Sequence, residues 1–218
     1  MNILVVAATQ FEVKPLSDFL GIALPTVGMN HANIDLEGKE IELLITGVGM
    51  VNTALMMGRH LTQNYDLVIN AGVSGAFDKN LELGQIVNVT EDVLSEMGAE
   101  DGEEFLTYDR LNLPGEYLFS VQHKSYLMLD LLKKVKGITV NTVHGNETAI
   151  EKVKQLYNPE VESMEGAAFF AACKGISKNY MQIRTVSNYV EKRDKSKWQM
   201  PLAIKNLNDF LITFIMNV

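Results

Sequence analysis

The sequence contains a single cysteine, Cys173, and comparatively few basic residues. One cysteine excludes an intramolecular disulfide and a cysteine-rich metal site, and it favours a cytoplasmic setting. Acidic residues number 27 against 19 lysines and arginines, which gives a net charge of -8, and the basic residues in 191–197 are interspersed with acids. Such a surface is not expected to bind nucleic acid or an anionic membrane, so a small molecule is the expected partner.

Long apolar runs and metal-binding motifs are also missing. No stretch approaches the roughly 20 apolar residues that cross a bilayer. The four histidines have no HxxxH or HExxH spacing, so we expect no metal site, and no cofactor is expected either. The first residues carry no charged leader before Glu12 and Lys14, which predicts a first strand rather than a signal peptide. With 218 residues, the chain is expected to form one domain, 1–218.

Apolar runs of strand length alternate with runs of helical periodicity along the chain. Thr9 is expected to cap the first helix and Gly21 to end it. This alternation predicts an α/β fold with a largely parallel sheet. Segment 97–105 is acidic and contains glycine, which predicts an exposed loop near the functional site. We expect strands at 3–8, 24–29, 32–37, 41–46, 66–70, 84–93, 138–144 and 180–186, and helices at 10–20, 51–61, 125–135, 147–157, 166–173 and 201–218.

Glu165 is a carboxylate in apolar surroundings, directly before the alanine-rich helix expected at 166–173. Burying an unpaired carboxylate costs about several kcal/mol, so this side chain is expected to have a partner. The strand that follows ends in Arg184, Ser187 and Asn188. Polar groups at the end of a parallel strand are typical of small-molecule sites in α/β sheets. The alternative is a purely structural ion pair between Glu165 and Arg184.

Glycines and one further acid lie at the ends of other predicted strands. Residues 47–50 and 71–76 form two glycine-containing corners, and Glu12 lies where the first strand leads into its helix. Two such corners side by side predict a ligand across the strand ends, although tight packing of loops also selects glycine. By itself, Glu12 fits a first-turn acid that complements the helix dipole.

Taken together, these segments resemble the nucleoside phosphorylase/hydrolase superfamily over nearly the whole chain. The resemblance rests on Glu12, 47–49, 72–75, 163–166 and 184–188. The chain is similar to the branch that contains methylthioadenosine/S-adenosylhomocysteine nucleosidases and futalosine hydrolases, and 98–102 and 187–194 look specifically like futalosine hydrolases of the menaquinone pathway. The resemblance implies a three-layer αβα sandwich with a mixed, largely parallel sheet. It also implies a homodimer or higher homo-oligomer, with 95–105 reaching a neighbour's site.

The resemblance also assigns roles to individual residues. It implies that Glu165 binds ribose hydroxyls, that Met164 packs on the sugar, and that Glu12 activates water with help from Arg184. Ser187 would position neighbouring polar groups. Cleavage of an N-glycosidic bond passes through an oxocarbenium-like sugar, which requires a held ribose and a nucleophile on the opposite face. Further residues implied in substrate binding are Val48, Val73, Ser74 and Gly75.

The nucleophile and the leaving base are inferred from two positions. Residues 70–75 contain no arginine, which the resemblance leads one to expect in a phosphorylase, so water is the expected nucleophile; Val73 stands where nucleosidases commonly carry a hydroxyl. Adenine-releasing relatives carry an aspartate at the position of Asn188. A carboxamide offers both N–H donors and a C=O acceptor, which suits a 6-oxopurine such as hypoxanthine. Thr148 and Ala149 replace an aromatic-aliphatic pair of the adenine-specific relatives.

The expected reaction is therefore hydrolysis of futalosine with release of hypoxanthine. One alternative is a methylthioadenosine/S-adenosylhomocysteine or aminofutalosine nucleosidase, which releases adenine. Another is a protein that binds a purine nucleoside without turnover. Arg193 and Lys195 are candidates to bind the carboxylate of futalosine's 5′ substituent, with a solvated charged loop as the alternative.

Overall fold

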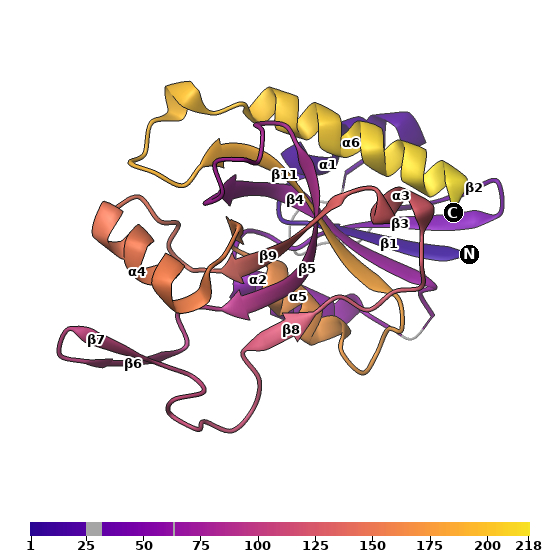
Figure 1. The fold of residues 1–218 in the computed structure, drawn as a ribbon. Helices are drawn as coiled ribbons and strands as arrows, with labels where there is room; N and C mark the ends of the chain where they lie inside the picture. The colour runs from indigo at the N-terminus through magenta and orange to yellow at the C-terminus, as the bar shows by residue number, and fades with distance from the viewer. Residues whose placement is uncertain (25–31, 63) are drawn as a thin grey trace.

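The computed structural model describes residues 1–24, 32–62 and 64–218, which form a mixed sheet with helices on both faces (Figure 1). The strands are β1 (Asn2–Ala7), β2 (Ala32–Leu36), β3 (Lys39–Ile45), β4 (Leu67–Ala76), β5 (Ile86–Leu94), β6 (Gly98–Asp101), β7 (Glu104–Thr107), β8 (Leu118–Ser120), β9 (Lys133–Thr139), β10 (Val161–Ser163) and β11 (Tyr180–Tyr189). The helices are α1 (Gln10–Leu20), α2 (Met50–His60), α3 (Leu127–Asp130), α4 (Glu147–Tyr157), α5 (Gly166–Cys173), α6 (Met200–Asn217) and a 3-10 turn, Lys195–Lys197.

The central strands are apolar on both faces because helices cover both. Side chains of β1, β3, β4 and β11 that point to one face pack with α1 and α6, and those on the opposite face pack with α2 and α5. In β1, for example, Ile3 and Val5 contact the first group and Leu4 and Val6 the second. This alternation is the two-residue period of a strand applied to a sheet buried on both sides. Figure 1 shows α1 and α6 together on one side of the sheet.

The main sheet has the order β10-β9-β5-β11-β4-β1-β3-β2, with β8 beside β5. β4 also pairs with β10, so β4, β11, β5, β9 and β10 close into a ring. In this closure Glu162 lies opposite Gly75. Consequently, the segment from Glu162 to Glu165 lies against the carboxyl end of β4, although about 90 residues separate them in sequence.

Most predicted elements are confirmed, but the strand expected at 138–144 shares only its first two residues with β9, and the helix expected at 125–135 is wrong. α3 covers only four residues of it, and β9 begins at Lys133. Leu127 and Leu131, which the helical pattern would bury, are each 79% exposed, whereas Val135 is buried in the sheet. The alternation of lysines with Val135 and Gly137 is the pattern of a strand, and the pairing of β9 with β5 prevails over the local helical periodicity.

Three smaller predictions also change. The second glycine corner, 71–76, is the continuation of β4, and β11 runs past Val186 to Tyr189. Segment 97–105 is not an irregular loop: it forms most of the β6–β7 hairpin, which projects from the body of the protein and contributes no residue to the cavity described below (Figure 1). Among the described strands of the main sheet, parallel pairings outnumber antiparallel ones and join more residues, so the sheet is mixed with a parallel majority, as the sequence predicted. The strand expected at 24–29 lies almost entirely outside the described residues.

Two sequence expectations concern membranes and metals. Across the described part of the chain, no helix has the length and apolarity needed to cross a bilayer. The same residues contain no cluster of three histidine, cysteine, aspartate or glutamate side chains with the geometry of a metal site.

Candidate active site

A cavity of about 650 Å³ lies at the carboxyl ends of β4, β10 and β11. Residues from the ends of these strands line it together with the starts of α1 and α6. Nine of the ten residues singled out in the sequence are in its wall, and the tenth, Arg184, is buried behind it. The nine are Glu12, Val48, Val73, Ser74, Gly75, Met164, Glu165, Ser187 and Asn188.

Glu12 is held by backbone donors at the start of α1. Its Oε2 accepts hydrogen bonds from the Thr9 N–H (2.9 Å) and the Thr9 hydroxyl (3.0 Å), and its Oε1 accepts one from the Val73 N–H (3.2 Å). The carboxylate therefore belongs to the N-terminal capping of the helix and at the same time faces the cavity. Its orientation is fixed by the fold before any ligand binds.

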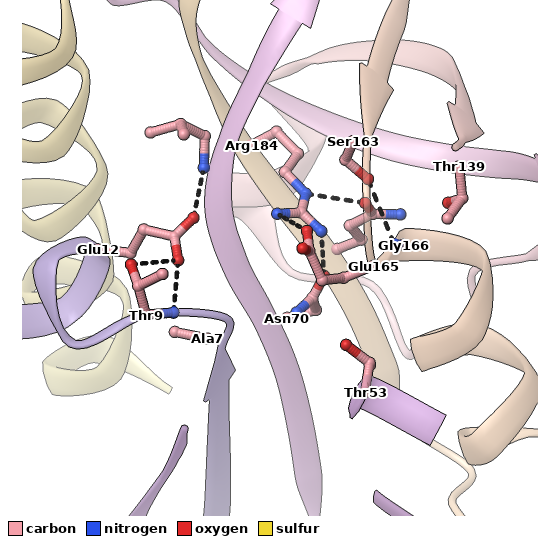
Figure 2. A network of polar contacts seen from close by, with 12 residues as sticks. Ala7, Thr9, Glu12, Thr53, Asn70, Thr139, Ser163, Glu165, Gly166 and Arg184 are labelled. Carbon is pink, nitrogen blue, oxygen red and sulfur yellow. Dashed lines mark hydrogen bonds and ion pairs between the residues drawn. The ribbon is translucent and has the colours of Figure 1, made fainter. Parts of the chain in front are cut away.

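Arg184 is the largest fully buried side chain and its donors are all directed inward. Its Nε donates to Gln182 Oε1 (2.9 Å) and its Nη2 donates to Asn70 Oδ1 (2.5 Å). Its Nη1 lies 3.7 Å from Glu165 Oε2. Figure 2 shows the Arg184 guanidinium next to Asn70 and Glu165, so its positive charge lies beside a buried carboxylate.

Glu165 is buried and has the polar partners that were expected for a buried carboxylate. Besides Arg184, its Oε1 accepts a hydrogen bond from the Gly49 N–H at 3.1 Å. Gly49 has a φ of 99°, a backbone conformation that favours glycine, and it immediately precedes α2. The first glycine corner thus turns a backbone donor toward Glu165, and the expectation of a partner is confirmed.

Gly72, within β4, lies so close to Arg184 and Glu12 that a side chain does not fit there. A Cβ at this position would lie 2.2 Å from Arg184 Nη1 and 2.7 Å from Glu12 Oε1. Real side chains do not tolerate such distances, so only glycine allows the guanidinium and the carboxylate to approach each other across the strand. The sequence indicated a turn at this glycine, but Gly72 lies within a continuous strand, where the absence of a side chain leaves room for Arg184 and Glu12.

Burial and charge together change the acidity of Glu12. Burial raises its pKa above the ordinary value, and the nearby Glu165 carboxylate raises it further, whereas Arg184 and the backbone donors oppose the shift. A carboxylate with a raised pKa is a stronger base, closer to the acidity that suits proton transfer near neutral pH.

A further buried acid, Asp92 on β5, was not identified from the sequence. Its Oδ2 accepts from Gln182 Nε2 (3.0 Å) and its Oδ1 accepts from the Thr139 hydroxyl (2.8 Å). The same Thr139 oxygen accepts from the Ala167 N–H (2.8 Å) at the start of α5. Asp92 therefore orients the Gln182 amide so that its oxygen faces Arg184, and it also fixes the helix that begins beside Glu165.

The pKa of Asp92 predicts a pH-dependent stability. Burial raises this pKa from 3.8 to about 6, so the folded protein holds the proton more tightly than the unfolded chain, and the carboxylate costs stability that grows as pH rises across this range. The shift corresponds to about 3 kcal/mol. The free energy of unfolding is measured with urea for wild type and for Asp92→Asn. The wild-type value minus the Asp92→Asn value should fall by about this amount between about pH 4 and about pH 7. A difference that does not change with pH contradicts the assignment.

Ser187 and Asn188 lie at an irregularity of β11. The pairing of β11 with β4 shifts register between Val186 and Asn188, which indicates a bulge at Ser187. Ser187 Oγ lies 2.8 Å from Asn188 Oδ1 and 3.2 Å from the Ser74 carbonyl oxygen, both of which can accept its hydrogen, and Asn188 Nδ2 donates to the Tyr189 carbonyl (3.0 Å). One N–H of the Asn188 amide is left for a ligand. No simple sequence pattern announces this bulge.

Other residues are placed differently from the sequence interpretation. Trp198 and Met200, which the sequence did not indicate as site residues, both line the cavity. Arg193 also lines it, with its guanidinium 5.0 Å from the centre of the Trp198 ring, whereas Lys195 is exposed in the 3-10 turn and does not. Ser74 Oγ is buried without a hydrogen-bond partner among the described residues, so its capacity is available to a ligand. Thr148 and Ala149 are exposed on α4, outside the cavity wall.

Comparison of the sequence with known protein families identifies the family of this chain. The sequence pattern of the family described as the phosphorylase superfamily matches residues 2–216. The chain belongs to this superfamily.

Named relatives in the phosphorylase superfamily fall into two groups. A futalosine hydrolase of Thermus thermophilus is 29% identical over 180 residues, which cover 79% of this chain and 80% of that protein. A 5′-methylthioadenosine/S-adenosylhomocysteine nucleosidase of Colwellia psychrerythraea is 26% identical over 221 residues, covering 94% and 90%. The native structure of a Helicobacter pylori futalosine hydrolase superposes with a TM-score of 0.84 at 16% identity, over 100% of this chain and 98% of the other, so the superfamily fold is shared.

Proposed function

We propose that the protein hydrolyses the N-glycosidic bond of futalosine and releases hypoxanthine, with water activated by Glu12. The electrostatics of the cavity support cleavage of a glycosidic bond. Three buried carboxylates, Glu12, Glu165 and Asp92, surround the single guanidinium of Arg184. A net negative charge fixed in a buried site stabilises the positive charge that develops on the sugar in an oxocarbenium-like transition state.

Each reacting group has a residue in reach of it. Glu165 and Met164 are proposed to bind the ribose, because they follow β10 in the wall of the cavity. Glu12 takes a proton from water, and the positive charge of Arg184 stabilises the neighbouring carboxylates in their charged form. Attack by the water forms the C1′–O bond while the C1′–N9 bond breaks and its electron pair leaves with the base.

The same charges favour water over phosphate as the nucleophile. Among the described residues of the cavity wall, the acids are Glu12, Glu162 and Glu165, and the cation is Arg193, which lies against Trp198. The donors of Arg184 are directed to protein oxygens. A dianionic phosphate would therefore meet carboxylates without a free cluster of donors.

The observation that carries the choice of base is the arrangement of Asn188. Its oxygen accepts from the Ser187 hydroxyl and one of its N–H groups donates to the Tyr189 carbonyl, which leaves the other N–H available to a ligand. That donor matches the O6 carbonyl of hypoxanthine, whereas the 6-amino group of adenine is itself a donor. The 29% identity to a futalosine hydrolase agrees with this choice. The apolar wall at Phe11, Val48, Met200 and Ile204 suits an aromatic 5′ substituent.

Asn188→Asp should change the base preference toward adenine. The carboxylate would repel O6 and accept from a 6-amino group, while the Ser187 hydroxyl still donates to it. We expect the ratio of kcat/KM for futalosine to that for aminofutalosine to fall by about 10²-fold. Asn112→Asp, which adds the same charge at an exposed position, serves as the control and should leave the ratio unchanged. An unchanged ratio in Asn188→Asp would show that another residue selects the base.

The proposed substrate is tested by competition among nucleosides. Futalosine, aminofutalosine, methylthioadenosine and inosine are incubated with wild-type protein, and the released bases are separated by chromatography. We expect hypoxanthine from futalosine with the highest kcat/KM. Adenine as the preferred product would favour the other group of relatives and refute the Asn188 argument, and no release from any nucleoside would indicate a protein that only binds.

We also propose a cytoplasmic homo-oligomer. Exposed apolar side chains at Phe11, Val48, Val51 and Leu55 lie on α1, α2 and the turn before α2, where a partner subunit would cover them. Sedimentation velocity distinguishes an oligomer from a 24.3 kDa monomer.

A further inference from the structure

The proposed hydrolysis leaves one proton unaccounted for. When the C1′–N9 bond breaks, the base departs with the electron pair and must gain a proton unless it leaves as an anion. An aspartate at the position of Asn188 would supply such a proton, but a carboxamide does not act as an acid at neutral pH. If the proposed function holds, a different titratable group must serve the base end of the cavity.

A side chamber of about 210 Å³ adjoins the cavity at Asn188. The two spaces share six residues, which mark the base end: Gly75, Val143, Glu162, Asn188, Arg193 and Trp198. The chamber continues beyond them to His144, Gly145, Tyr189 and Glu191. His144 is thus a histidine that lines the chamber next to the base end, and histidine is the side chain that ordinarily exchanges protons between about pH 5 and 8.

His144 is held firmly by Glu162. Its Nδ1 lies 2.7 Å from Glu162 Oε2, and its backbone N–H donates to Glu162 Oε1 at 3.1 Å. Glu162 is 4% exposed and is fixed by the pairing of β10 with both β4 and β9. Because the carboxylate only accepts, Nδ1 is the nitrogen that donates to Glu162, and Nε2 takes no part in that hydrogen bond.

The other charges around the chamber have partners of their own. Glu191 accepts from Lys79 (2.9 Å) and Lys197 (3.2 Å), and the Arg193 guanidinium lies over the Trp198 ring. From the end of β4, the Phe77 ring lies edge-on to the imidazole at a centroid distance of 5.9 Å. Glu162 is therefore the charged group that His144 contacts directly.

We propose that His144, oriented by Glu162, protonates the departing base. The C1′–N9 electron pair moves into the purine, the Nε2 proton passes to N7 directly or through one water, and neutral hypoxanthine leaves. The water that attacks C1′ gives its proton to Glu12. Exchange with solvent then returns a proton to His144 and removes one from Glu12, so that the net reaction is addition of one water across the bond.

A substrate that needs no proton provides the test. In N7-methylated futalosine the base already carries a positive charge and leaves as a neutral molecule. His144→Asn keeps a donor at the position of Nδ1 for Glu162 and removes Nε2. We expect this variant to lower kcat for futalosine by about 10²-fold and kcat for the N7-methylated substrate by less than about threefold. His123→Asn, at a half-buried histidine outside the cavity wall, should change neither value.

The pH profile gives a second readout. An alkaline fall in the wild-type kcat profile should be absent in His144→Asn. Equal losses on both substrates would mean that His144 only supports the structure, and no loss on futalosine would mean that the base needs no acid; either result overturns the proposal. A failure of the proposed function would appear differently, as a wild-type protein that releases no hypoxanthine.

Discussion

Glu12→Gln is expected to lower kcat for futalosine by about 10³-fold and to leave the Kd for futalosine within about threefold of wild type. Glutamine keeps the shape and one acceptor for the Thr9 or Val73 N–H, but it cannot take a proton from water. The glutamine NH₂ group would face the other of these two N–H donors, and the lost hydrogen bond should cost about 1 kcal/mol of stability. Single-turnover kinetics and calorimetric binding measure the two quantities separately.

The control for Glu12→Gln is the same substitution at Glu151, which is exposed on α4 and should have no effect. Wild-type kcat/KM should also decline toward acid pH as Glu12 becomes protonated, starting at a higher pH than an ordinary glutamate because burial raises the pKa of Glu12. A variant that binds poorly yet turns over bound futalosine normally would assign Glu12 to binding instead of water activation.

Glu165→Ala should weaken the ground state and the transition state together. The ribose would lose a charged acceptor, and the Gly49 N–H and the Arg184 guanidinium would lose a partner. A hydrogen bond to a charged group contributes about 1.5 to 3 kcal/mol. Loss of two such bonds from the ribose hydroxyls to the Glu165 carboxylate corresponds to a fall in kcat/KM of about 10³-fold. Steady-state kinetics should show a higher KM and a lower kcat.

Glu165→Gln separates the ribose contact from the support of α2. Glutamine still accepts from Gly49 and still reaches the sugar, but it carries no charge for Arg184 or for the oxocarbenium ion. We expect kcat to fall while the thermal midpoint stays close to that of wild type. If Glu165→Ala raises only KM and leaves kcat unchanged, Glu165 contributes no specific stabilisation to the transition state.

Part of the site follows from the sequence because one local argument suffices. Glu165 lies between Met164 and an apolar helix, and a buried carboxylate needs a partner, which the structure provides in Gly49 and Arg184. The helices α1 and α5 were predicted for similar local reasons, α1 from a cap and a stop residue and α5 from an alanine-rich apolar run. The likeness to the superfamily added Glu12, whose spacing alone indicated only helix capping.

The remainder depends on contacts between distant segments. Asp92 and Gln182 meet because β5 and β11 pair antiparallel, and Glu162 meets His144 because β10 closes the sheet onto β4. No periodicity within either segment encodes these pairings. The failed helix at 125–135 has the same origin, since β9 gains its stability from β5 and β10.

The most direct measurement is a single reaction of wild-type protein with futalosine in phosphate-free buffer, analysed for both products by chromatography. The account predicts hypoxanthine and a free reducing sugar in equal amounts, at a rate that added phosphate does not change. Absence of hypoxanthine, or its appearance only with phosphate and together with a sugar 1-phosphate, would contradict hydrolysis of futalosine by water in this cavity.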